Sequence, residues 1–175
     1  KGYLEIITKS ADRLLATIND VLDISRIEAG QVVVAKGEFD LNNLLIELHG
    51  FFKANTTKVE LRLSPGKAGS YMVNTDKVKL NQILTNLIGN AIKFTKDGYV
   101  EIGYTTGINN FTLFVKDTGI GIPEDKLEAV FDRFVQAHTT SENEFEGTGL
   151  GLSISKLFAE ILGGHLWVKS KVGEG

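Results

Sequence analysis

The first 30 residues carry hydrophobic side chains at the spacing of a long helix. Alternating steps of three and four residues form a heptad, which is typical of a helix that packs against other long helices. The positions are Leu4, Ile7, Ala11, Leu14, Ile18, Val21 and Ser25, widened by Leu15, Leu22 and Ile27. The pattern predicts a helix over 3–28 that ends at Ala29-Gly30. Its apolar face needs a partner, either another long helix, as in a bundle or dimer, or the chain's own globular domain.

From residue 31 the pattern changes to short alternating stretches and amphipathic segments, which places a domain boundary near 30–37. Strands are predicted at 32–35, 38–40, 58–63, within 66–75, and at 98–106, 110–117 and 165–170. Helices are predicted at 41–54, 76–95, 124–134 and 150–162. Asp40 is a suitable N-cap for the first of these, and Gly107, Asn109 and Asn110 suit a hairpin turn. The order predicts an α+β fold, a two-layer α/β sandwich with a mixed sheet and helices on one face.

The helix predicted at 76–95 has an apolar side and a narrow polar stripe. At about 100° per residue, the stripe collects Lys79, Gln82, Asn86, Asn90 and Lys93. Asparagine oxygens are hard ligands that Mg²⁺ accepts without adding negative charge beside a phosphate, and lysine offers a point charge to phosphate. The stripe therefore suggests a magnesium–phosphate site, although a solvated helix face explains this helix equally well when it is judged alone.

Two segments are rich in glycine. In "DTGIGIP" (117–123), Gly119 and Gly121 follow Asp117, a pattern that suits either a loop closing over a ligand or a tight turn. In "GTGLGLS" (147–153), glycines lead directly into a helix, whose first amides form an anion site. The second segment matches neither the P-loop nor the dinucleotide-binding pattern, so phosphate binding requires another design.

Composition narrows the class of protein. The chain has 175 residues, 42% hydrophobic, 23% charged, with a net charge of -3, which describes a soluble globular chain. No apolar run reaches the roughly 18 residues of a membrane span, and no signal-peptide pattern is present. The absence of cysteine excludes disulfides and thiolate chemistry and fits the cytoplasm, although a parent protein can hold membrane spans elsewhere. Scattered Lys and Arg and mild acidity argue against nucleic acid as a partner.

Four segments occur in the order "NLIGNAIKFT", "DTGIGIP", "FDRF" and "GTGLGLSI". They resemble the N, G1, F and G2 boxes of the ATP-binding domain of sensor histidine kinases. The stretch "YLEIITKSADRLLATINDVLDISRIEAG" resembles the second helix of the family's dimerisation and phosphotransfer domain, in the style of hybrid sensor kinases. The resemblance implies a partial dimerisation domain at 1–30 and an ATP-binding catalytic domain of the Bergerat type at 31–175, without its last strand.

The resemblance also implies a function and its partners. The protein is expected to use ATP and Mg²⁺ to phosphorylate a histidine on a helix upstream of Lys1, in two-component signal transduction. Its expected partners are a second copy of the chain, bound through the long helix, and a response-regulator receiver domain. His49, His138 and His165 are not expected to be the acceptor. A non-catalytic nucleotide-sensing module and a related ATPase of the same fold remain alternatives, the latter disfavoured by the heptad helix.

The residue roles implied by the resemblance fall into three groups. Asp117 accepts a hydrogen bond from the adenine amino group, with Gly119, Gly121 and Ile122 beside the base and sugar. Asn90, with Asn86, holds Mg²⁺; Asn90 and Lys93 are the catalytic pair. The remaining nucleotide-binding residues are Phe94, Phe134, Gly147, Thr148, Gly149, Leu150 and Gly151. Phe131 and Phe134 anchor a lid over 135–147, whose Glu142, Glu144 and Glu146 would repel a triphosphate unless they point outward.

Overall fold

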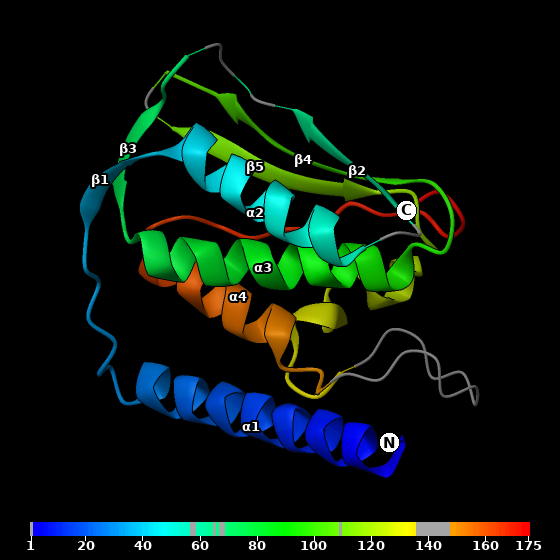
Figure 1. Cartoon of the computed structure of the whole chain (residues 1–175). Coiled ribbons are helices and arrows are strands. Elements are labelled where there is room, and N and C mark those ends of the chain that lie inside the picture. The colour runs from blue at the N-terminus through cyan, green and yellow to red at the C-terminus, as the bar shows by residue number, and fades with distance from the viewer. Residues whose placement is uncertain (1, 57–58, 65, 67–68, 109, 136–147) are drawn as a thin grey trace.

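The computed structural model describes residues 2–56, 59–64, 66, 69–108, 110–135 and 148–175. Its elements follow one another as α1 (Gly2–Glu28), β1 (Gly37–Asp40), α2 (Leu41–Asn55), β2 (Glu60–Ser64), β3 (Met72–Thr75), α3 (Lys77–Phe94), β4 (Tyr99–Thr106), β5 (Phe111–Asp117), the 3₁₀ turns η1 (Glu124–Lys126) and η2 (Ala129–Phe131), and α4 (Gly151–Ile161). In Figure 1, β2, β4 and β5 lie above α3, with α4 and then α1 below it, and β1 and β3 lie at the left.

The strands of the described residues form a three-stranded mixed sheet and a separate pair. Strand β4 pairs in parallel with β2 and antiparallel with β5, in registers that place Tyr99 opposite Glu60 and Val100 opposite Asp117. Strands β1 and β3 form an antiparallel pair of their own. The mixed sheet and the hairpin of β4 and β5 are as the sequence predicts.

One hydrophobic core joins the sheet to two helices. Val100, Ile102 and Tyr104 of β4 alternate along the strand, so they point to the same face of the sheet. They pack with buried side chains of both helices: Leu41, Leu44, Leu45 and Leu48 of α2, and Leu80, Leu84, Ile88 and Ala91 of α3. The predicted two-layer arrangement, with helices on one face of a mixed sheet, is therefore confirmed.

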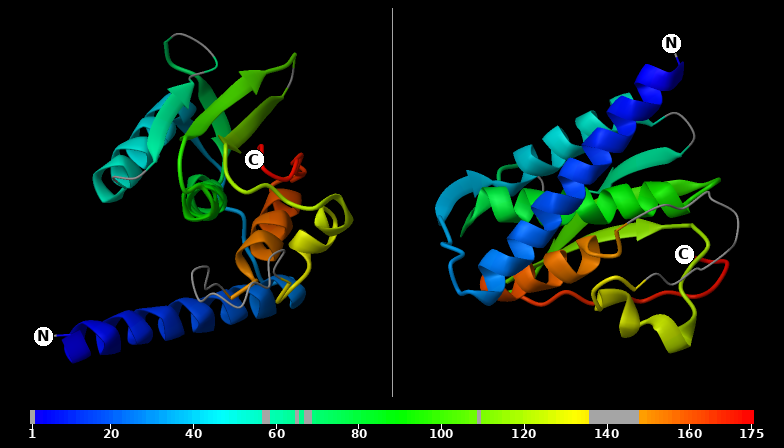
Figure 2. Two further views of the ribbon diagram at one scale, coloured as in Figure 1. Left: turned by 90° about the vertical axis from the view of Figure 1, so that its right-hand side faces the viewer. Right: turned by 90° about the horizontal axis from the view of Figure 1, so that it is seen from below.

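Helix α1 extends beyond the rest of the molecule, as the left view of Figure 2 shows. Its C-terminal part buries Ile24 in a second core, formed with Ile83, Leu150, Ile154 and Phe158. Other members of the heptad face are exposed: Ile7, Leu14, Ile18 and Val21, with the neighbouring Leu15 and Leu22. The side chain of Leu4 lies outside the described part. None of the helices in the described ranges has the length and apolarity needed to cross a membrane.

The end of α1 follows the sequence prediction in detail. Gly30 adopts a positive φ of 64°, the conformation that glycine reaches without steric cost. The N–H of Gly30 donates to the Ile27 carbonyl at 3.0 Å, and that of Gln31 donates to the Arg26 carbonyl at 2.9 Å. These two bonds define a Schellman motif, which satisfies carbonyl groups that the helix leaves unpaired.

Three predicted elements are wrong. Residues 32–35 form a connector and not a strand, because the Ala35 N–H donates to the side chain of Asp76 and the Val33 carbonyl accepts from that of Lys79. The helix predicted at 124–134 is reduced to η1 and η2, since the apolar spacing of three between Leu127 and Val130 also suits tight 3₁₀ turns. The strand predicted at 165–170 pairs with no described strand. Its end bonds instead to the loop after β5, where Ile122 N–H donates to Ser170 Oγ at 2.8 Å.

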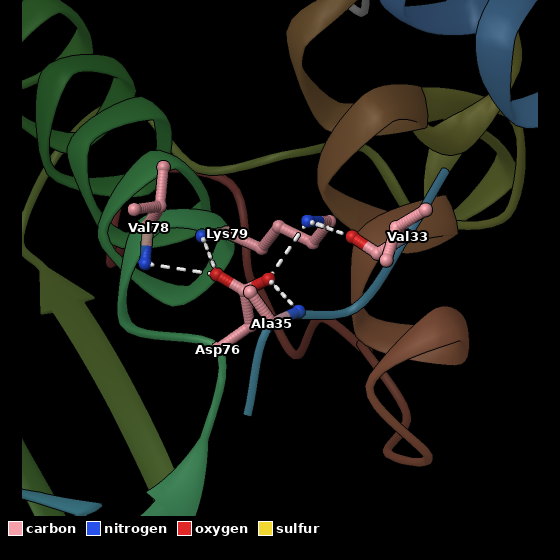
Figure 3. A network of polar contacts seen from close by, with 5 residues as sticks. All are labelled: Val33, Ala35, Asp76, Val78 and Lys79. Carbon is pink, nitrogen blue, oxygen red and sulfur yellow. Dashed lines mark hydrogen bonds and ion pairs between the residues drawn. The ribbon is translucent and has the colours of Figure 1, made fainter. Parts of the chain in front are cut away.

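Asp76 holds the connector to the start of α3 (Figure 3). Its Oδ1 caps the helix by accepting from the backbone N–H groups of Val78 at 3.0 Å and Lys79 at 3.1 Å. Its Oδ2 accepts from the Ala35 N–H at 2.9 Å and from the Lys79 ammonium at 2.8 Å. The same ammonium donates to the Val33 carbonyl at 2.8 Å. One carboxylate therefore binds two segments that lie about 40 residues apart in the sequence.

The protonation of Asp76 reflects this network. Burial by itself would raise the pKa of Asp76, whose side chain is 2% exposed. Hydrogen bonds from the Lys79 ammonium and from the backbone of Lys79 and Ala35, with the charge of Lys79, outweigh burial and lower the pKa from 3.8 to about 2. Because the folded-state pKa lies below the unfolded value, the ionised group stabilises the fold at neutral pH, by about 2 kcal/mol. This contribution is lost as the pH falls from 3.8 through about 2.

Asp76→Asn should therefore lower the free energy of unfolding by about 3 kcal/mol at pH 7, because the Lys79 ammonium, 15% exposed, loses its counter-charge. Urea unfolding followed by circular dichroism measures the change, and the difference from wild type should shrink as the pH approaches 2. Glu60→Gln breaks the exposed pair of Glu60 with Arg62 and is the matched control, with nearly unchanged stability. An Asp76→Asn variant that unfolds like this control would contradict the role of the buried carboxylate.

Candidate functional site

The polar stripe of α3 is half-buried and contacts other parts of the protein. Lys79 bonds to Asp76, and Gln82 Nε2 donates to Asp23 Oδ2 of α1 at 2.8 Å. One turn further, Asn86 contacts α4, and Asn90 contacts Asn86. The alternative of a simple solvated helix face is therefore not what the structure shows.

Asn86 and Asn90 form the centre of this row. Asn86 Nδ2 donates to Ser155 Oγ of α4 at 2.8 Å, and Asn90 Nδ2 donates to Asn86 Oδ1 at 3.4 Å. Gly151, at the start of α4, lies so close that a Cβ atom there would stand 2.2 Å from Asn86 Oδ1. The N-terminus of α4 and the asparagine pair are thus in direct contact.

The C-terminal end of α3 packs against the loop that follows β5. The Phe94 carbonyl accepts from the Ile120 N–H at 3.2 Å, and Asp117 Oδ1 accepts from the Gly119 N–H at 2.9 Å. The Lys93 ammonium lies 4.7 Å from the centre of the Phe94 ring, a cation–π distance. Asp117, Gly119, Phe94 and Lys93 are therefore brought together at one end of α3.

The glycines of both motifs are required by packing within the protein. A Cβ on Gly119 would stand 2.5 Å from the Phe94 carbonyl oxygen, and one on Gly121, whose φ is 70°, would stand 2.1 Å from the Lys171 carbonyl oxygen. At Gly149, whose φ is also 70°, a Cβ would meet the Phe134 backbone at 2.8 Å. The glycines after Asp117 therefore allow segments of the chain to pack closely against one another.

The residues on either side of 136–147 are joined to each other. Phe134 has a φ of 63°, which is unusual for a bulky residue, and its N–H donates to the Gly149 carbonyl at 3.0 Å. Leu150 is fully buried in the second core, and its N–H donates to Thr148 Oγ1 at 3.3 Å, so in this structure it is a packing residue. Most of the predicted lid lies outside the described residues: Gly147, His138, Glu142, Glu144 and Glu146.

Helix α1 reaches the same region through its acidic side chains. Thr148 Oγ1 donates to Asp20 Oδ2 at 3.2 Å, and the Arg133 guanidinium pairs with Glu28 at 2.6 Å. Burial raises the pKa of Asp20, the Thr148 hydrogen bond lowers it, and the negative charge of Asp23 raises it, with a net increase. Sequence analysis missed these contacts. The sequence shows only that acidic residues lie beside the apolar face of α1. That pattern does not identify the residues to which they bond.

The side chains that can bind a metal ion decide which metal fits the site. The described residues contain no group of three His, Cys, Asp or Glu side chains that could cage an ion. The available donors are the neutral amide oxygens of Asn86 and Asn90, and the Asn86 oxygen already accepts from Asn90. Mg²⁺ keeps several waters and phosphate oxygens and needs few protein ligands, so this set fits Mg²⁺ bound together with a phosphate compound.

Comparison with known proteins identifies a family and several relatives. Residues 75–175 match the family described as histidine kinase-, DNA gyrase B-, and HSP90-like ATPase. The autoinducer 2 sensor kinase/phosphatase LuxQ of Vibrio parahaemolyticus is 38% identical over 183 aligned residues, which cover 100% of this chain and 21% of LuxQ. The chain therefore spans about a fifth of the length of the curated relatives it matches.

Two solved structures resemble the whole chain. The crystal structure of full-length ShkA in complex with AMPPNP has a TM-score of 0.86 and 29% identity, covering 99% of this chain and 36% of ShkA. The histidine kinase ThkA in complex with the response regulator protein TrrA has a TM-score of 0.78 and 26% identity, covering 99% of this chain and 48% of ThkA. The arrangement of α1 and the ATP-binding fold therefore has known counterparts.

The contact between α3 and α4 predicts opposite effects of two glycine substitutions. Gly151→Ala should lower the free energy of unfolding by about 1–3 kcal/mol, because the Asn86 amide must move away from the new methyl group. Gly89→Ala lies on α3 with nothing within 4 Å of its Cβ, and should instead raise stability by about 0.5–1 kcal/mol. Urea unfolding compares the two. Equal gains from both would show that α3 and α4 are not in close contact.

Proposed function

Because the chain belongs to the histidine kinase-, DNA gyrase B- and HSP90-like ATPase family, we propose that it carries out the kinase step of a sensor histidine kinase. It binds ATP and transfers the γ-phosphoryl group to a histidine on a helix outside this chain, in two-component signalling. The observation that supports this most directly is the row of Asn86, Asn90 and Lys93 on α3. The row runs from the N-terminus of α4 to the loop after Asp117, and so links a phosphate end to an adenine end.

The adenine end is assigned to Asp117. The Gly119 N–H fixes one oxygen of the carboxylate, so the other is oriented to accept from the exocyclic amino group of adenine. Phe94, Gly121 and Ile122 are assigned to positions beside the base and sugar.

The phosphate end is assigned to the N-terminus of α4. This helix begins at Gly151 after Leu150, which makes no side-chain cap hydrogen bond. The first N–H groups of the helix are therefore available to phosphate oxygens. Thr148 and Gly149, with Phe134 packed against Gly149, are assigned to the same end, and Gly147, also assigned here, lies outside the described residues.

Asn90, with Asn86 beside it, is assigned to Mg²⁺, and Lys93 to the phosphates. When bound, Mg²⁺ would neutralise phosphate charge during transfer. Asn90 orients the metal-bearing end of the nucleotide without adding negative charge, and the Lys93 ammonium attracts the charge that develops on the transferred group. The contribution of the protein is positioning and electrostatic stabilisation.

The wider assignments follow from the same function. Residues 1–30 belong to the dimerisation and phosphotransfer part, and residues 31–175 to the ATP-binding part. A response-regulator receiver domain takes the phosphoryl group from the histidine; the complex of ThkA with TrrA supports this partner. The cytoplasm is the compartment in which ATP and receiver domains meet. The chain pairs with a second copy through the exposed apolar face of α1, since such a face in a single chain indicates a missing partner.

Two substitutions should separate the metal end from the adenine end. Asn90→Ala should remove most of the enhancement that Mg²⁺ gives to ATP binding, while metal-free ADP binds nearly as before. Asp117→Asn should weaken ADP and ATP alike by about ten- to a hundredfold, because a charge-assisted hydrogen bond is lost. Calorimetric titration with and without Mg²⁺ measures both. If both variants titrate like wild type under all conditions, the assigned site is wrong.

Transfer itself distinguishes a kinase from a nucleotide-sensing module of the same fold. The chain extended upstream to include the acceptor helix should form an acid-labile phosphohistidine with γ-labelled ATP, and Asn90→Ala should abolish it. Tight ATP binding without any labelled protein would favour the sensing module, and steady ATP hydrolysis without labelling would favour a related ATPase.

Self-association through α1 has its own test. Replacing Leu14 and Ile18 with Glu should convert a dimer into a monomer that still binds nucleotide, because two charges then lie on the exposed apolar face. Analytical ultracentrifugation measures the state. Ile46→Glu places the same charge at an exposed apolar position of α2 and should leave the dimer intact. A wild type that sediments as a monomer at high concentration would contradict the pairing.

A further inference from the structure

We propose that Ser155 is a positioning residue for the magnesium end of the site, acting through Asn86 on Asn90. The inference rests on the proposed function, which assigns Mg²⁺ to Asn90. Ser155 Oγ accepts from Asn86 Nδ2 at 2.8 Å, and Asn86 Oδ1 accepts from Asn90 Nδ2 at 3.4 Å. The three side chains form a hydrogen-bonded row from α4 across α3, which we call the amide row.

The direction of the hydrogen bonds in the amide row decides which atom Asn90 presents. An asparagine amide has a donor end and an acceptor end, and only its oxygen binds a cation. In the structure, the Asn90 nitrogen is turned toward Asn86, which directs its Oδ1 elsewhere. In the reverse direction, Asn90 Oδ1 would accept from Asn86 and the amide nitrogen would face the metal, where it would repel the ion.

Ser155 anchors the inner end of this row because its buried oxygen is the acceptor that holds the Asn86 amide nitrogen. Its side chain is 2% exposed on α4, and the hydrogen bond to Asn86 crosses between two helices. The outer bond, at 3.4 Å, is long and therefore weak, so it cannot fix both amides by itself. Hydrogen bonds in a chain polarise one another, and a fixed end strengthens the next bond.

Ser153, a second serine on α4, is buried like Ser155 but takes no part in the amide row. Its hydroxyl donates to the Leu150 carbonyl at 2.7 Å, within its own helix. Its bond caps local backbone and reaches no residue of α3. Ser153→Ala therefore removes a buried hydroxyl from α4 without touching the amide row, which makes it the matched control for Ser155→Ala.

The first experiment needs no metal and no nucleotide. In the metal-free protein labelled with ¹⁵N, the side-chain NH₂ signals of Asn86 and Asn90 report their hydrogen bonds. Ser155→Ala should shift both pairs of signals and increase the hydrogen-exchange rate of the Asn86 NH₂ by about three- to tenfold, because its buried acceptor is lost. Ser153→Ala should leave both pairs in place. If Ser155→Ala moves neither pair, or only that of Asn86, the relay to Asn90 is wrong.

The second experiment measures the consequence at the magnesium end. Calorimetric titration should show that Ser155→Ala reduces the Mg²⁺ enhancement of ATP binding by about three- to tenfold, with metal-free ADP binding unchanged. An enhancement equal to that of Ser153→Ala would overturn the positioning role. Asn90→Ala in the same series separates the two proposals. If Asn90→Ala retains the full Mg²⁺ enhancement of ATP binding, Mg²⁺ is wrongly assigned to Asn90. If Asn90→Ala loses the enhancement and Ser155→Ala keeps it, only the role of Ser155 is contradicted.

Discussion

Helix α3 is packed on both of its sides, and this double burial decides what its polar residues do. One side carries Leu84 and Ile88 into the core against the sheet. The other side faces α1, α4 and the loop after β5, where half-buried polar groups are within reach of partners in the protein or of a bound ligand. Gln82, Asn86 and Asn90 have such partners in the structure. A row that looks like an ordinary solvated face in the sequence is therefore an ordered set of donors and acceptors.

Glycine makes this packing possible, which is a role beside the ligand contact that the motifs suggest. At Gly119, Gly121 and Gly151 a side chain would collide with other atoms of the protein. A side chain at Gly151 would separate α4 from Asn86, and one at Gly119 would separate the Asp117 loop from the end of α3. The same close approach that glycine permits inside the protein thus sets the distance between the two ends of the proposed nucleotide site.

The sequence predicted the elements that depend on a local residue pattern. It failed for segments whose conformation depends on contacts with residues far away in the sequence. The extents of α1 and α3, the cap at Asp40 and the hairpin of β4 and β5 follow from periodicity and capping, which are encoded within a few residues. The strand expected at 32–35 does not form, because the side chains of Asp76 and Lys79 bond to the backbone of Ala35 and Val33. Motifs located the candidate site, whereas Ser155 was missed because nothing local marks a serine that bonds to a helix some 70 residues earlier.

Helix α1 shows how one continuous pattern divides between two environments. A heptad pattern shows which positions of a helix are apolar, but it does not show which part of a protein packs against them. Near its C-terminal end α1 buries Ile24 on the domain, while the face around Leu14 is exposed in the single chain. Asp20 and Glu28 bind Thr148 and Arg133, which lie after and before residues 136–147 in the sequence. Helix α1 therefore cannot move away from the domain without breaking bonds on both sides of that segment, so the geometry of the long helix and that of the proposed phosphate end are physically linked.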